Sequence, residues 1–212
     1  MTALMEPRTR KGWSTRRRIM DGAGKVFGRQ GYTAARMLDI AGESGISLGA
    51  VYRYFRNKDD IFEAVILELD DELFLATHVD AGPGFSLATD PYHVMLLANR
   101  AHLEIYARYA DVLRSLHEAS SIEPRYFEMT LRARRRFRDR FLRRFQETHL
   151  SSSDGAAQQL VLRVDALIHM TDYLAYTWLA QPGLTGIQPA PDLETLATVI
   201  TDIWHRSLFC GP

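Results

Sequence analysis

Apolar side chains recur every three or four positions along most of this chain, which is the spacing of one face of an α-helix. The pattern begins with Ile19, Ala23, Val26 and Phe27 and returns in the middle and in the last third of the sequence. No segment shows the sustained alternation of apolar and polar residues that is typical of a half-buried strand. Runs rich in glycine, proline and serine interrupt the pattern, and about nine helices fit between them. The predicted fold class is all-α.

Two short helices are predicted on either side of Gly45, the first of them over residues 37–44. Glycine adopts the left-handed conformation that ends a helix at little cost, and Ser47 is a good cap for the helix that follows. Val51 and Phe55 lie four residues apart and give the second helix its buried face. This layout of helix, tight turn and helix is typical of proteins that place the second helix in the major groove of DNA.

The residues left outside that buried face form the candidate DNA-binding set. Gly49 and Ala50 are small enough to let the helix backbone approach the floor of the groove. Arg53 is the main candidate for reading a base, because a guanidinium can pair with both acceptors of guanine. Tyrosine and lysine side chains nearby are better suited to phosphates. The residues predicted to contact DNA are Arg36, Ser47, Leu48, Gly49, Ala50, Tyr52, Arg53, Tyr54 and Lys58.

This stretch resembles the DNA-binding domain of the TetR family of bacterial transcriptional regulators. The family pattern is met at fixed spacing by Gly31, Tyr32, Asp39, Ile40, Ala41, Gly45, Ile46, Ser47, Tyr52, Tyr54, Phe55 and Lys58. The specific similarity covers residues 14–65, and beyond them only the helical character matches. Ala35 and Arg36 stand where many members have two threonines, and Ala50 stands where a polar base reader is common. These departures leave Arg53 as the main reader and make Arg36 a charged substitute for a hydroxyl contact to phosphate.

Three glycines, Gly22, Gly24 and Gly42, lie inside the helices predicted for this region. Each makes a helix less stable by about 1 kcal/mol relative to alanine. We therefore expect a domain that is somewhat loose until it is bound.

Charge is unevenly distributed, although the chain of 212 residues has no net charge. Residues 1–60 hold 12 Lys and Arg against 6 Asp and Glu, a net charge of +6, which leaves −6 on the remainder. Clustered positive charge is the electrostatic footprint of phosphate binding, while an acidic remainder tends to stay away from nucleic acid. A solvated charged surface without a partner is the plainer alternative.

Three segments are expected: a flexible basic arm over residues 1–14, a DNA-binding domain over 15–60 and a helical domain over 61–212. No apolar run reaches 18 residues and the basic amino terminus has no apolar core behind it, so we expect a cytoplasmic protein without a membrane partner. The seven histidines show no paired metal spacing within one helix, and no enzyme motif occurs. We therefore expect neither an enzyme nor a cofactor or metal.

The resemblance implies that the carboxy-terminal helices bind a small-molecule effector and form a homodimer through the last two long helices. Helix 156–179 is apolar on two faces and must be covered on both. One face joins the last helix in a candidate dimer seam: Leu160, Val164, Leu167, Leu174, Trp178, Ile200 and Trp204. The opposite face carries Leu162, Ala166, His169, Tyr173 and Tyr176, and the sequence does not decide between the two. A monomer that covers both faces internally is the alternative.

Candidate effector-binding residues combine apolar bodies with polar tips, as small-molecule sites do. They are Met95, His102, Tyr106, Tyr109, Arg134, Phe137, His169 and Tyr173. An ordinary core edge explains them equally well. Arg134 falls inside the apolar stripe of the helix that spans residues 123–149 and needs a partner, which is either an internal carboxylate such as Glu104 or an acidic effector.

The predicted function is a homodimeric repressor that leaves a palindromic operator when a small molecule binds. The two second helices of the motif would enter successive major grooves roughly 34–36 Å apart. The main alternative is a DNA-binding dimer without a small-molecule effector that is controlled by a partner protein. An enzyme built on the helical domain is the remote alternative.

Overall fold

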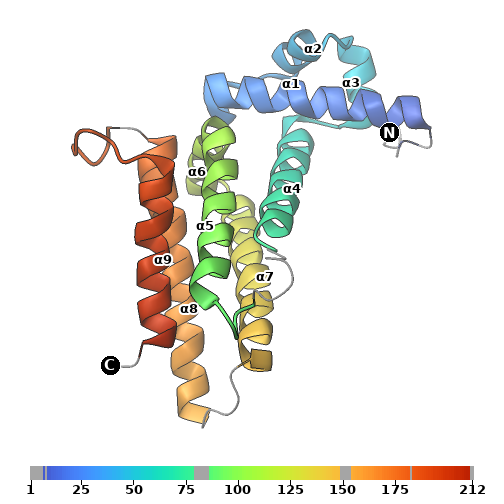
Figure 1. The fold of residues 1–212 in the computed structure, drawn as a ribbon. Coiled ribbons are helices and arrows are strands. Elements are labelled where there is room, and N and C mark those ends of the chain that lie inside the picture. The colour runs from blue at the N-terminus through green and yellow to red at the C-terminus, as the bar shows by residue number, and fades with distance from the viewer. Residues whose placement is uncertain (1–6, 8, 79–85, 149–153, 182, 211–212) are drawn as a thin grey trace. The chain divides into compact units, whose positions relative to one another are not determined.

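The computed structural model describes residues 7, 9–78, 86–148, 154–181 and 183–210, which form helices and turns with no strand among them (Figure 1). The all-α prediction is confirmed. The helices are α1 (Arg10–Ala34), α2 (Met37–Ser44), α3 (Leu48–Tyr54), α4 (Lys58–Ala76), α5 (Pro91–Arg108), α6 (Ala110–Ile122), α7 (Pro124–Thr148), α8 (Asp154–Ala175), the π-helical turn η1 (Tyr176–Ala180) and α9 (Leu193–Phe209). None of these helices is long and apolar enough to cross a membrane.

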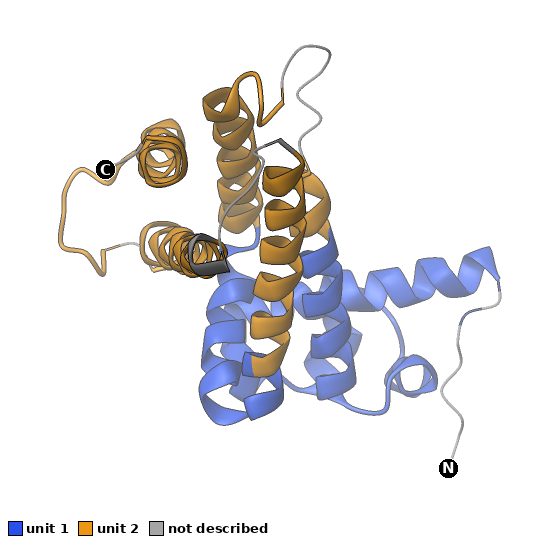
Figure 2. Ribbon diagram, turned by 90° about the horizontal axis from the view of Figure 1, so that it is seen from below, with its two compact units in different colours: residues 1–71, 109–127 blue, residues 72–108, 128–212 orange. Residues whose placement is uncertain are grey.

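The chain divides into two compact units, which Figure 2 colours separately. The first unit comprises residues 1–71 and 109–127, and the second comprises residues 72–108 and 128–212. The first unit therefore extends beyond the predicted boundary at residue 60 and takes in α6 from the middle of the chain.

Helix α1 is the longest element of the first unit. It begins at Arg10, where the Thr9 hydroxyl accepts a hydrogen bond from the Gly12 N–H. Its start lies inside the segment 1–14 that was expected to be a flexible arm, and residues 1–6 and 8 of that segment lie outside the described residues. The predicted apolar stripe of α1 is buried: Ile19, Ala23, Val26 and Phe27 are each 0% exposed.

Two glycines let neighbouring helices approach α1 closely. A Cβ atom at Gly22 would lie 2.9 Å from the backbone nitrogen of Ser44 in α2, and one at Gly28 would lie 2.9 Å from the Cβ of Asp111 in α6. On the α6 side, Ser115 donates a hydrogen bond to the carbonyl of Phe27 at 2.6 Å. Close packing thus offsets the low helix propensity of Gly22, and the expectation of a loose domain does not follow from that residue.

Four aromatic rings fill the centre of the first unit. The ring of Phe62 in α4 lies 4.6 Å from that of Phe27 and 5.0 Å from that of Tyr32, centroid to centroid. Tyr126 of α7 meets Phe62 edge-on at 5.1 Å and Tyr32 at 5.2 Å. Such pairs are more favourable than their buried area alone suggests. Because Tyr126 is fully buried among these rings, residues 109–127 share one core with the amino-terminal helices.

The second unit is built around α5, α8 and α9, and Figure 1 shows α8 and α9 side by side. Its fully buried side chains include Leu103, Val164, Ala197, Ile200 and Thr201. Polar groups in this core are paired across helices, as burial requires. Asn99 donates to the Thr201 hydroxyl at 3.0 Å, and the Trp204 indole N–H donates to the Thr171 hydroxyl at 2.9 Å.

The face of α8 and α9 that was expected to form a dimer seam is packed within the single chain. Val164, Leu167, Ile200 and Trp204 are at most 5% exposed, and Leu160, Leu174 and Trp178 are partly buried. A side chain packed inside one chain is not available to a second copy, so the prediction is wrong for the four buried residues. The exposed apolar residues lie on the other face of α8 and on α9: Leu162, Tyr173, Val199 and Ile203.

A second arginine besides Arg134 is drawn into the interior of the second unit. Arg140 is 8% exposed and donates hydrogen bonds to the carbonyl of Phe74 and, at 2.7 Å, to the Thr77 hydroxyl. Its guanidinium also lies 3.8 Å from the centroid of the Phe74 ring. Arg140 therefore caps the last turn of α4, where unpaired carbonyls favour a positive charge.

Replacing Gly22 with alanine should destabilise the first unit, whereas Gly42→Ala should stabilise it. The Cβ added at Gly22 would force α1 away from α2, with an expected loss of about 1–3 kcal/mol. At Gly42, inside α2, the added Cβ meets no heavy atom within 4 Å. Alanine there should raise the free energy of unfolding by up to about 1 kcal/mol through helix propensity. Urea denaturation of both variants measures the difference, and effects of equal sign would show that close approach does not explain Gly22.

Candidate functional site

The turn between α2 and α3 has the geometry expected of a helix-turn-helix. Gly45 is left-handed, with φ 63° and ψ 32°, and its N–H reaches the carbonyls of Ala41 and Gly42 at the end of α2. Ser47 occupies the N-cap position of α3, although its side chain makes no capping hydrogen bond. On the inner side of α3, Val51 is 0% exposed and Phe55, which follows it, is 3% exposed. The buried support predicted for the second helix is therefore present.

Two arginines of α1, which the sequence did not single out, hold this motif in place. Arg18 donates through Nη2 to the carbonyl of Ser44 at 3.0 Å, at the negative end of the α2 dipole. The Arg16 guanidinium lies over the ring of Phe55, 5.0 Å from its centroid. A cation over an aromatic face is attracted to it. Helix α1 thus fixes the turn and the end of α3 through two separate contacts.

The residues predicted to contact DNA differ in exposure. Ser47, Gly49, Tyr52 and Arg53 are exposed, as is Arg36 before α2, while Leu48, Ala50, Tyr54 and Lys58 are half-buried. Some other basic side chains of this unit are in ion pairs, such as Arg29 with Glu43 at 2.7 Å and Arg56 with Asp60 at 2.8 Å. Arg36 and Arg53 form no ion pair within the described part of the chain. Their positive charges are therefore available to an anionic partner.

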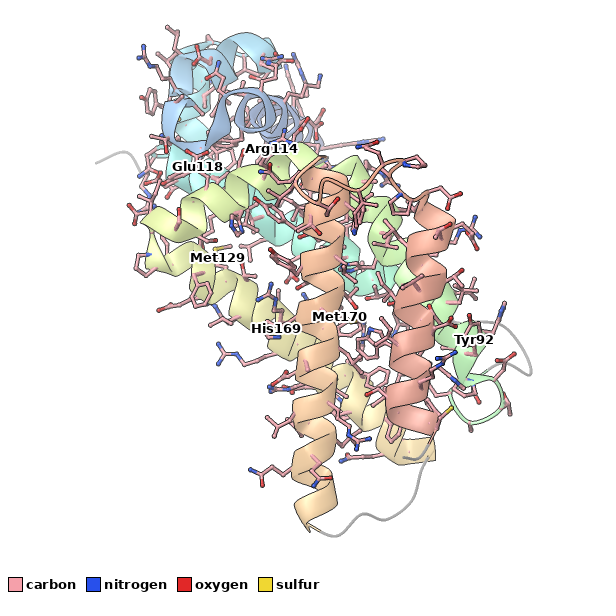
Figure 3. The ribbon with its side chains drawn as sticks, turned by 90° about the vertical axis from the view of Figure 1, so that its left-hand side faces the viewer. Tyr92, Arg114, Glu118, Met129, His169 and Met170 are labelled. Carbon is pink, nitrogen blue, oxygen red and sulfur yellow. The ribbon has the colours of Figure 1, made fainter. Side chains whose placement is uncertain are left out.

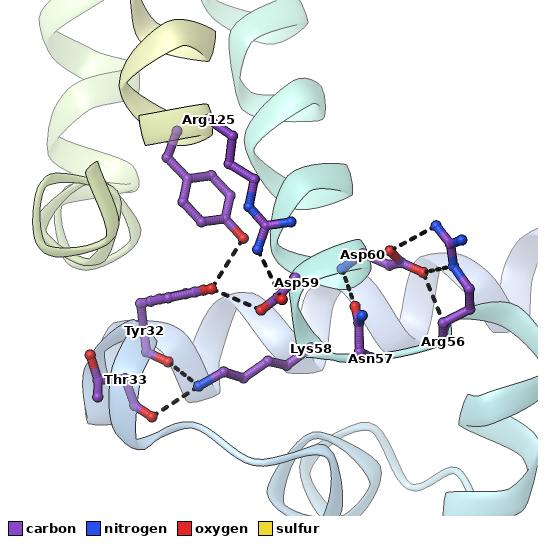
Figure 4. Close-up of polar contacts among 9 residues, drawn as sticks. Tyr32, Thr33, Arg56, Asn57, Lys58, Asp59, Asp60 and Arg125 are labelled. Atoms are coloured by element: carbon purple, nitrogen blue, oxygen red, sulfur yellow. Dashed lines mark hydrogen bonds and ion pairs between the residues drawn. The ribbon is translucent and has the colours of Figure 1, made fainter. Parts of the chain in front are cut away.

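The peptide groups of Tyr32 and Thr33 are held on both sides by charged side chains from distant segments. Glu118 of α6 accepts hydrogen bonds from the Tyr32 N–H at 3.0 Å, the Thr33 N–H at 3.2 Å and the Thr33 hydroxyl at 2.5 Å. Lys58 of α4 donates to the carbonyls of the same two residues, both at 2.9 Å (Figure 4). We refer to these contacts as the Glu118–Lys58 clamp. The clamp satisfies four backbone groups just before the chain enters α2.

Gly31 is what makes this clamp possible. Its φ of 79° interrupts the regular helix, so the N–H groups that follow need partners other than the carbonyls of α1. A Cβ at this position would lie 2.5 Å from a carboxylate oxygen of Glu118. Both the backbone conformation and the space therefore require glycine. The glycine and aromatic pair of the sequence pattern thus has a structural origin.

A second set of polar contacts ties the start of α7 to the start of α4. The Tyr32 hydroxyl donates to Asp59 at 2.8 Å, and Arg125 pairs with the other carboxylate oxygen of Asp59 at 2.9 Å (Figure 4). The Tyr126 hydroxyl donates to that of Tyr32 at 3.4 Å. Burial raises the pKa of both tyrosines above its usual value, so their phenols stay protonated. Asn57 caps α4 by accepting from the Asp60 N–H at 2.8 Å.

Lys58 has a structural part in this arrangement. Its ammonium group uses two N–H donors on the Tyr32 and Thr33 carbonyls and lies 4.8 Å from the centroid of the Tyr32 ring. One of its three donors remains. A phosphate contact by Lys58 stays a prediction, but the structure gives the residue a reason to be lysine without DNA.

The predicted effector residues do not form one group. Met95, His102, Tyr106, Arg134 and Phe137 belong to the second unit and are buried or half-buried. Tyr109 directly follows the last residue of α5 and is counted with the first unit. His169 and Tyr173 are exposed on α8, and Figure 3 shows His169 on that helix. The exposure of His169 and Tyr173 does not favour a buried effector site, and an effector contact of Tyr109 stays a prediction.

Arg134 has an internal carboxylate partner, but not the one suggested by the sequence. Its Nε donates to Asp172 of α8 at 2.7 Å. Glu104 lies instead beside Arg100 at 3.4 Å. The ion pair predicted as one of two alternatives is thus present with a different partner. Across the described residues, no group of three or more His, Cys, Asp or Glu could hold a metal ion.

The sequence model for bacterial regulatory proteins of the tetR family matches residues 19–65, from the middle of α1 into α4. The resemblance to this family is thereby confirmed for the helix-turn-helix region. An HTH-type transcriptional regulator of Aromatoleum sp. (strain CIB), HbdR, is 46% identical over 46 residues, which are 22% of this chain and 20% of HbdR. SrpR of Pseudomonas putida, also named an HTH-type transcriptional regulator, is 38% identical over 68 residues, which are 32% of either chain.

These curated relatives are matched over only a fifth to a third of their length. Solved structures resemble the chain much further. A transcriptional regulator from Rhodococcus sp. Rha1 has a TM-score of 0.70 at 20% identity, covering 93% of this chain and 99% of that one. Salmonella enterica GusR has a TM-score of 0.70 at 18% identity, covering 98% and 99%. The TetR-type fold therefore extends over both units, and the relatives are named as regulators rather than enzymes.

Replacing Glu118 with glutamine should lower the free energy of unfolding by about 1–2 kcal/mol, because charge-assisted hydrogen bonds become neutral ones. Hydrogen bonds from Thr33 lower the pKa of Glu118 below its usual value of 4.5. A lowered pKa stabilises the fold above that value, and the contribution is lost as the pH falls through the folded-state pKa. The difference between the original protein and Glu118→Gln should therefore be full at pH 7 and shrink below about pH 4.5.

Thermal unfolding at several pH values measures this difference. Glu63→Gln, an exposed carboxylate on α4, is the matched control and should change stability little at any pH. A loss for Glu118→Gln that is independent of pH would contradict the role given to its charge.

Proposed function

We propose that this TetR-family chain is a sequence-specific DNA-binding regulator that represses transcription by occupying a palindromic operator. The observation that carries the proposal is the exposed outer side of α3, with Arg53 unpaired and its support fixed by Arg16 and Arg18. A rigid short helix with a free guanidinium is suited to reading guanine in the major groove. One relative, from Mycobacterium tuberculosis, is named an HTH-type transcriptional repressor, which supports repression as the mode of action.

The dimer that such an operator requires is proposed to form through the exposed faces of α8 and α9. Leu162 and Tyr173 are 62% and 63% exposed on α8, and Val199 and Ile203 are 47% and 40% exposed on α9. Ala166 and His169 lie between the two α8 residues at helical spacing and are also exposed. Two adjacent apolar helix faces in each copy can pair as a four-helix bundle. This is the second of the two faces that the sequence left open.

We also propose that a small molecule bound in the second unit controls release from DNA. The family resemblance supports this part, together with the buried polar residues of α5, α7 and α8. Binding is expected to shift the population between a conformation that docks both α3 helices and one that does not. The coupling free energy equals the difference between the binding free energies of the effector for these two conformations.

The DNA-binding proposal is tested by selecting operator sequences from random DNA with the full chain and measuring affinity by fluorescence anisotropy. Arg53→Ala should relax discrimination at one base pair in each half-site, with about 1–3 kcal/mol lost for that pair. Arg36→Ala should weaken selected and random DNA alike and lower the salt dependence by about one ion per site. Failure to enrich any sequence would contradict the proposed function, and uniform weakening by Arg53→Ala would remove its reading role.

The dimer proposal predicts opposite outcomes for two aspartate substitutions on α8. Leu162→Asp places a charge on the exposed face and should give folded monomers, because the pairing surface would contain a desolvated carboxylate. Leu167→Asp places the charge in the core of the single chain, where the residue is 5% exposed, and should prevent stable folding. Sedimentation velocity with circular dichroism separates these results. A folded dimer of Leu162→Asp would show that copies associate elsewhere.

A further inference from the structure

His102 of α5 carries a buried polar atom without a hydrogen-bond partner. Its Nε2 lies 3.4 Å from a carboxylate oxygen of Asp172 but makes no hydrogen bond with it. Among the described residues, no other buried side-chain nitrogen or oxygen lacks a hydrogen-bond partner. An unsatisfied buried polar atom makes the fold less stable by about 1–3 kcal/mol. A ligand or a water that hydrogen-bonds to His102 Nε2 would remove this unfavourable contribution.

Tyr106 lies one helical turn further along α5 and offers a second polar tip. Its ring centroid is 5.4 Å from that of His102, and the residue is 9% exposed. Its hydroxyl makes no hydrogen bond with a described residue. Burial raises the pKa of Tyr106, with Asp172 adding to the effect, so the phenol stays neutral and can donate or accept. The two tips therefore form an adjacent pair of unused hydrogen-bonding groups.

The charges around these tips already compensate each other. Arg134 pairs with Asp172 at 2.7 Å, and the side chains are 24% and 19% exposed. Burial lowers the pKa of His102, and the attraction of Asp172 offsets only part of that effect, so the imidazole is neutral at pH 7. A charged ligand here would have to break the ion pair or remain without a counter-charge, and either is unfavourable in a buried site.

We propose that the effector is an uncharged, largely apolar molecule whose hydroxyl group hydrogen-bonds to His102 and Tyr106. This inference rests on the proposed effector-responsive function. A hydroxyl both donates and accepts, so it satisfies His102 Nε2 in either tautomer and the Tyr106 hydroxyl at the same time. The apolar body of the molecule suits the same side of α5, where Met95 is 5% exposed and its flexible thioether adapts to different shapes.

The ligand class is tested by isothermal titration of the full chain with matched probes in the absence of DNA. Benzyl, cyclohexylmethyl and naphthylmethyl skeletons are each presented as the alcohol, the carboxylate and the ammonium. At least one alcohol should bind more tightly than its charged counterparts, by roughly tenfold or more. Preference for a carboxylate or an ammonium, or no binding of any alcohol, would overturn the proposal.

Two tyrosine variants on α5 locate the contact. Tyr106→Phe should weaken binding of the preferred alcohol by roughly three- to tenfold through loss of one hydrogen bond. Tyr92→Phe is the control, because the Tyr92 hydroxyl donates to Asp202 at 2.9 Å, and its removal should leave alcohol binding unchanged. Circular dichroism verifies that both variants fold. Equal loss in both variants, or no loss in Tyr106→Phe, would contradict the assignment.

Two charge variants test whether the Arg134–Asp172 ion pair determines the preference for uncharged ligands. Asp172→Asn leaves the Arg134 charge without its partner and should move the preference toward the carboxylate. Arg134→Gln leaves Asp172 and should move it toward the ammonium. An unchanged order of affinities in both folded variants would contradict the argument from charge.

A final measurement separates this inference from the proposed function. The preferred alcohol is added to the complex of the protein with its selected operator. Release of the operator DNA would support both the proposed ligand class and the proposed effector control. Binding of the alcohol without release would leave the ligand class intact and contradict effector control, whereas failure of the protein to select any operator would contradict the regulatory function alone.

Discussion

The Glu118–Lys58 clamp on the Tyr32 and Thr33 peptide groups is the constraint on which the DNA-binding surface depends. Gly31, with its positive φ, interrupts α1 near its end, and four backbone groups would lose their partners if the two side chains were absent. The direction in which the chain leaves this point determines where α2 begins. The contacts of α1 with α2, including the close approach at Gly22 and the hydrogen bond from Arg18, require that direction. The orientation of α3 therefore depends on a carboxylate from α6.

Sequence reasoning succeeded where the determining interactions are local. The left-handed Gly45 and the buried pair Val51 and Phe55 are each set by residues within four positions of one another. It did not find Glu118, whose partners are 85 and 86 residues away, because nothing in the segment around it distinguishes this glutamate from a solvated one. The same reason explains the absence of α6 from the predicted DNA-binding domain.

The two apolar faces of α8 show a different limit. Periodicity identifies both faces but does not tell which one packs within the chain. That choice is made by α9, which presents Trp204 to Thr171, and by the close packing of α5 and α9 through Asn99 and Thr201. The partner of Arg134 is likewise a matter of which helix faces it. Glu104 and Asp172 are both carboxylates, and the sequence alone does not tell which of them meets Arg134. In the fold, Asp172 lies 2.7 Å from Arg134 Nε.

Several residues of the family pattern have structural tasks in this chain, whereas the main candidate for reading a base lies outside the pattern. Gly31, Tyr32 and Lys58 match the family pattern, and each has a structural task in the clamp or the aromatic cluster. Arg36 and Arg53 lie outside that pattern, are exposed and form no ion pair with a described residue. Residues of the family pattern with structural tasks stabilise the helix-turn-helix, and their contacts are needed whatever DNA sequence is bound. Operator choice is then left to the positions that the pattern leaves free.

Chain connectivity supports the proposed coupling between effector and operator. Helix α7 begins in the first unit with Arg125, which pairs with Asp59, and continues into the second unit, where it carries Arg134. Helix α5 carries His102 and Tyr106 and is followed directly by α6, which carries Glu118. One element that bears proposed effector contacts, α5, thus leads into α6 of the clamp, and the other, α7, carries at its start the arginine that pairs with Asp59. Under the proposed function, a shift of α7 reaches Arg125 through continuous helical backbone, whereas a shift of α5 reaches Glu118 through Tyr109, the one residue between α5 and α6.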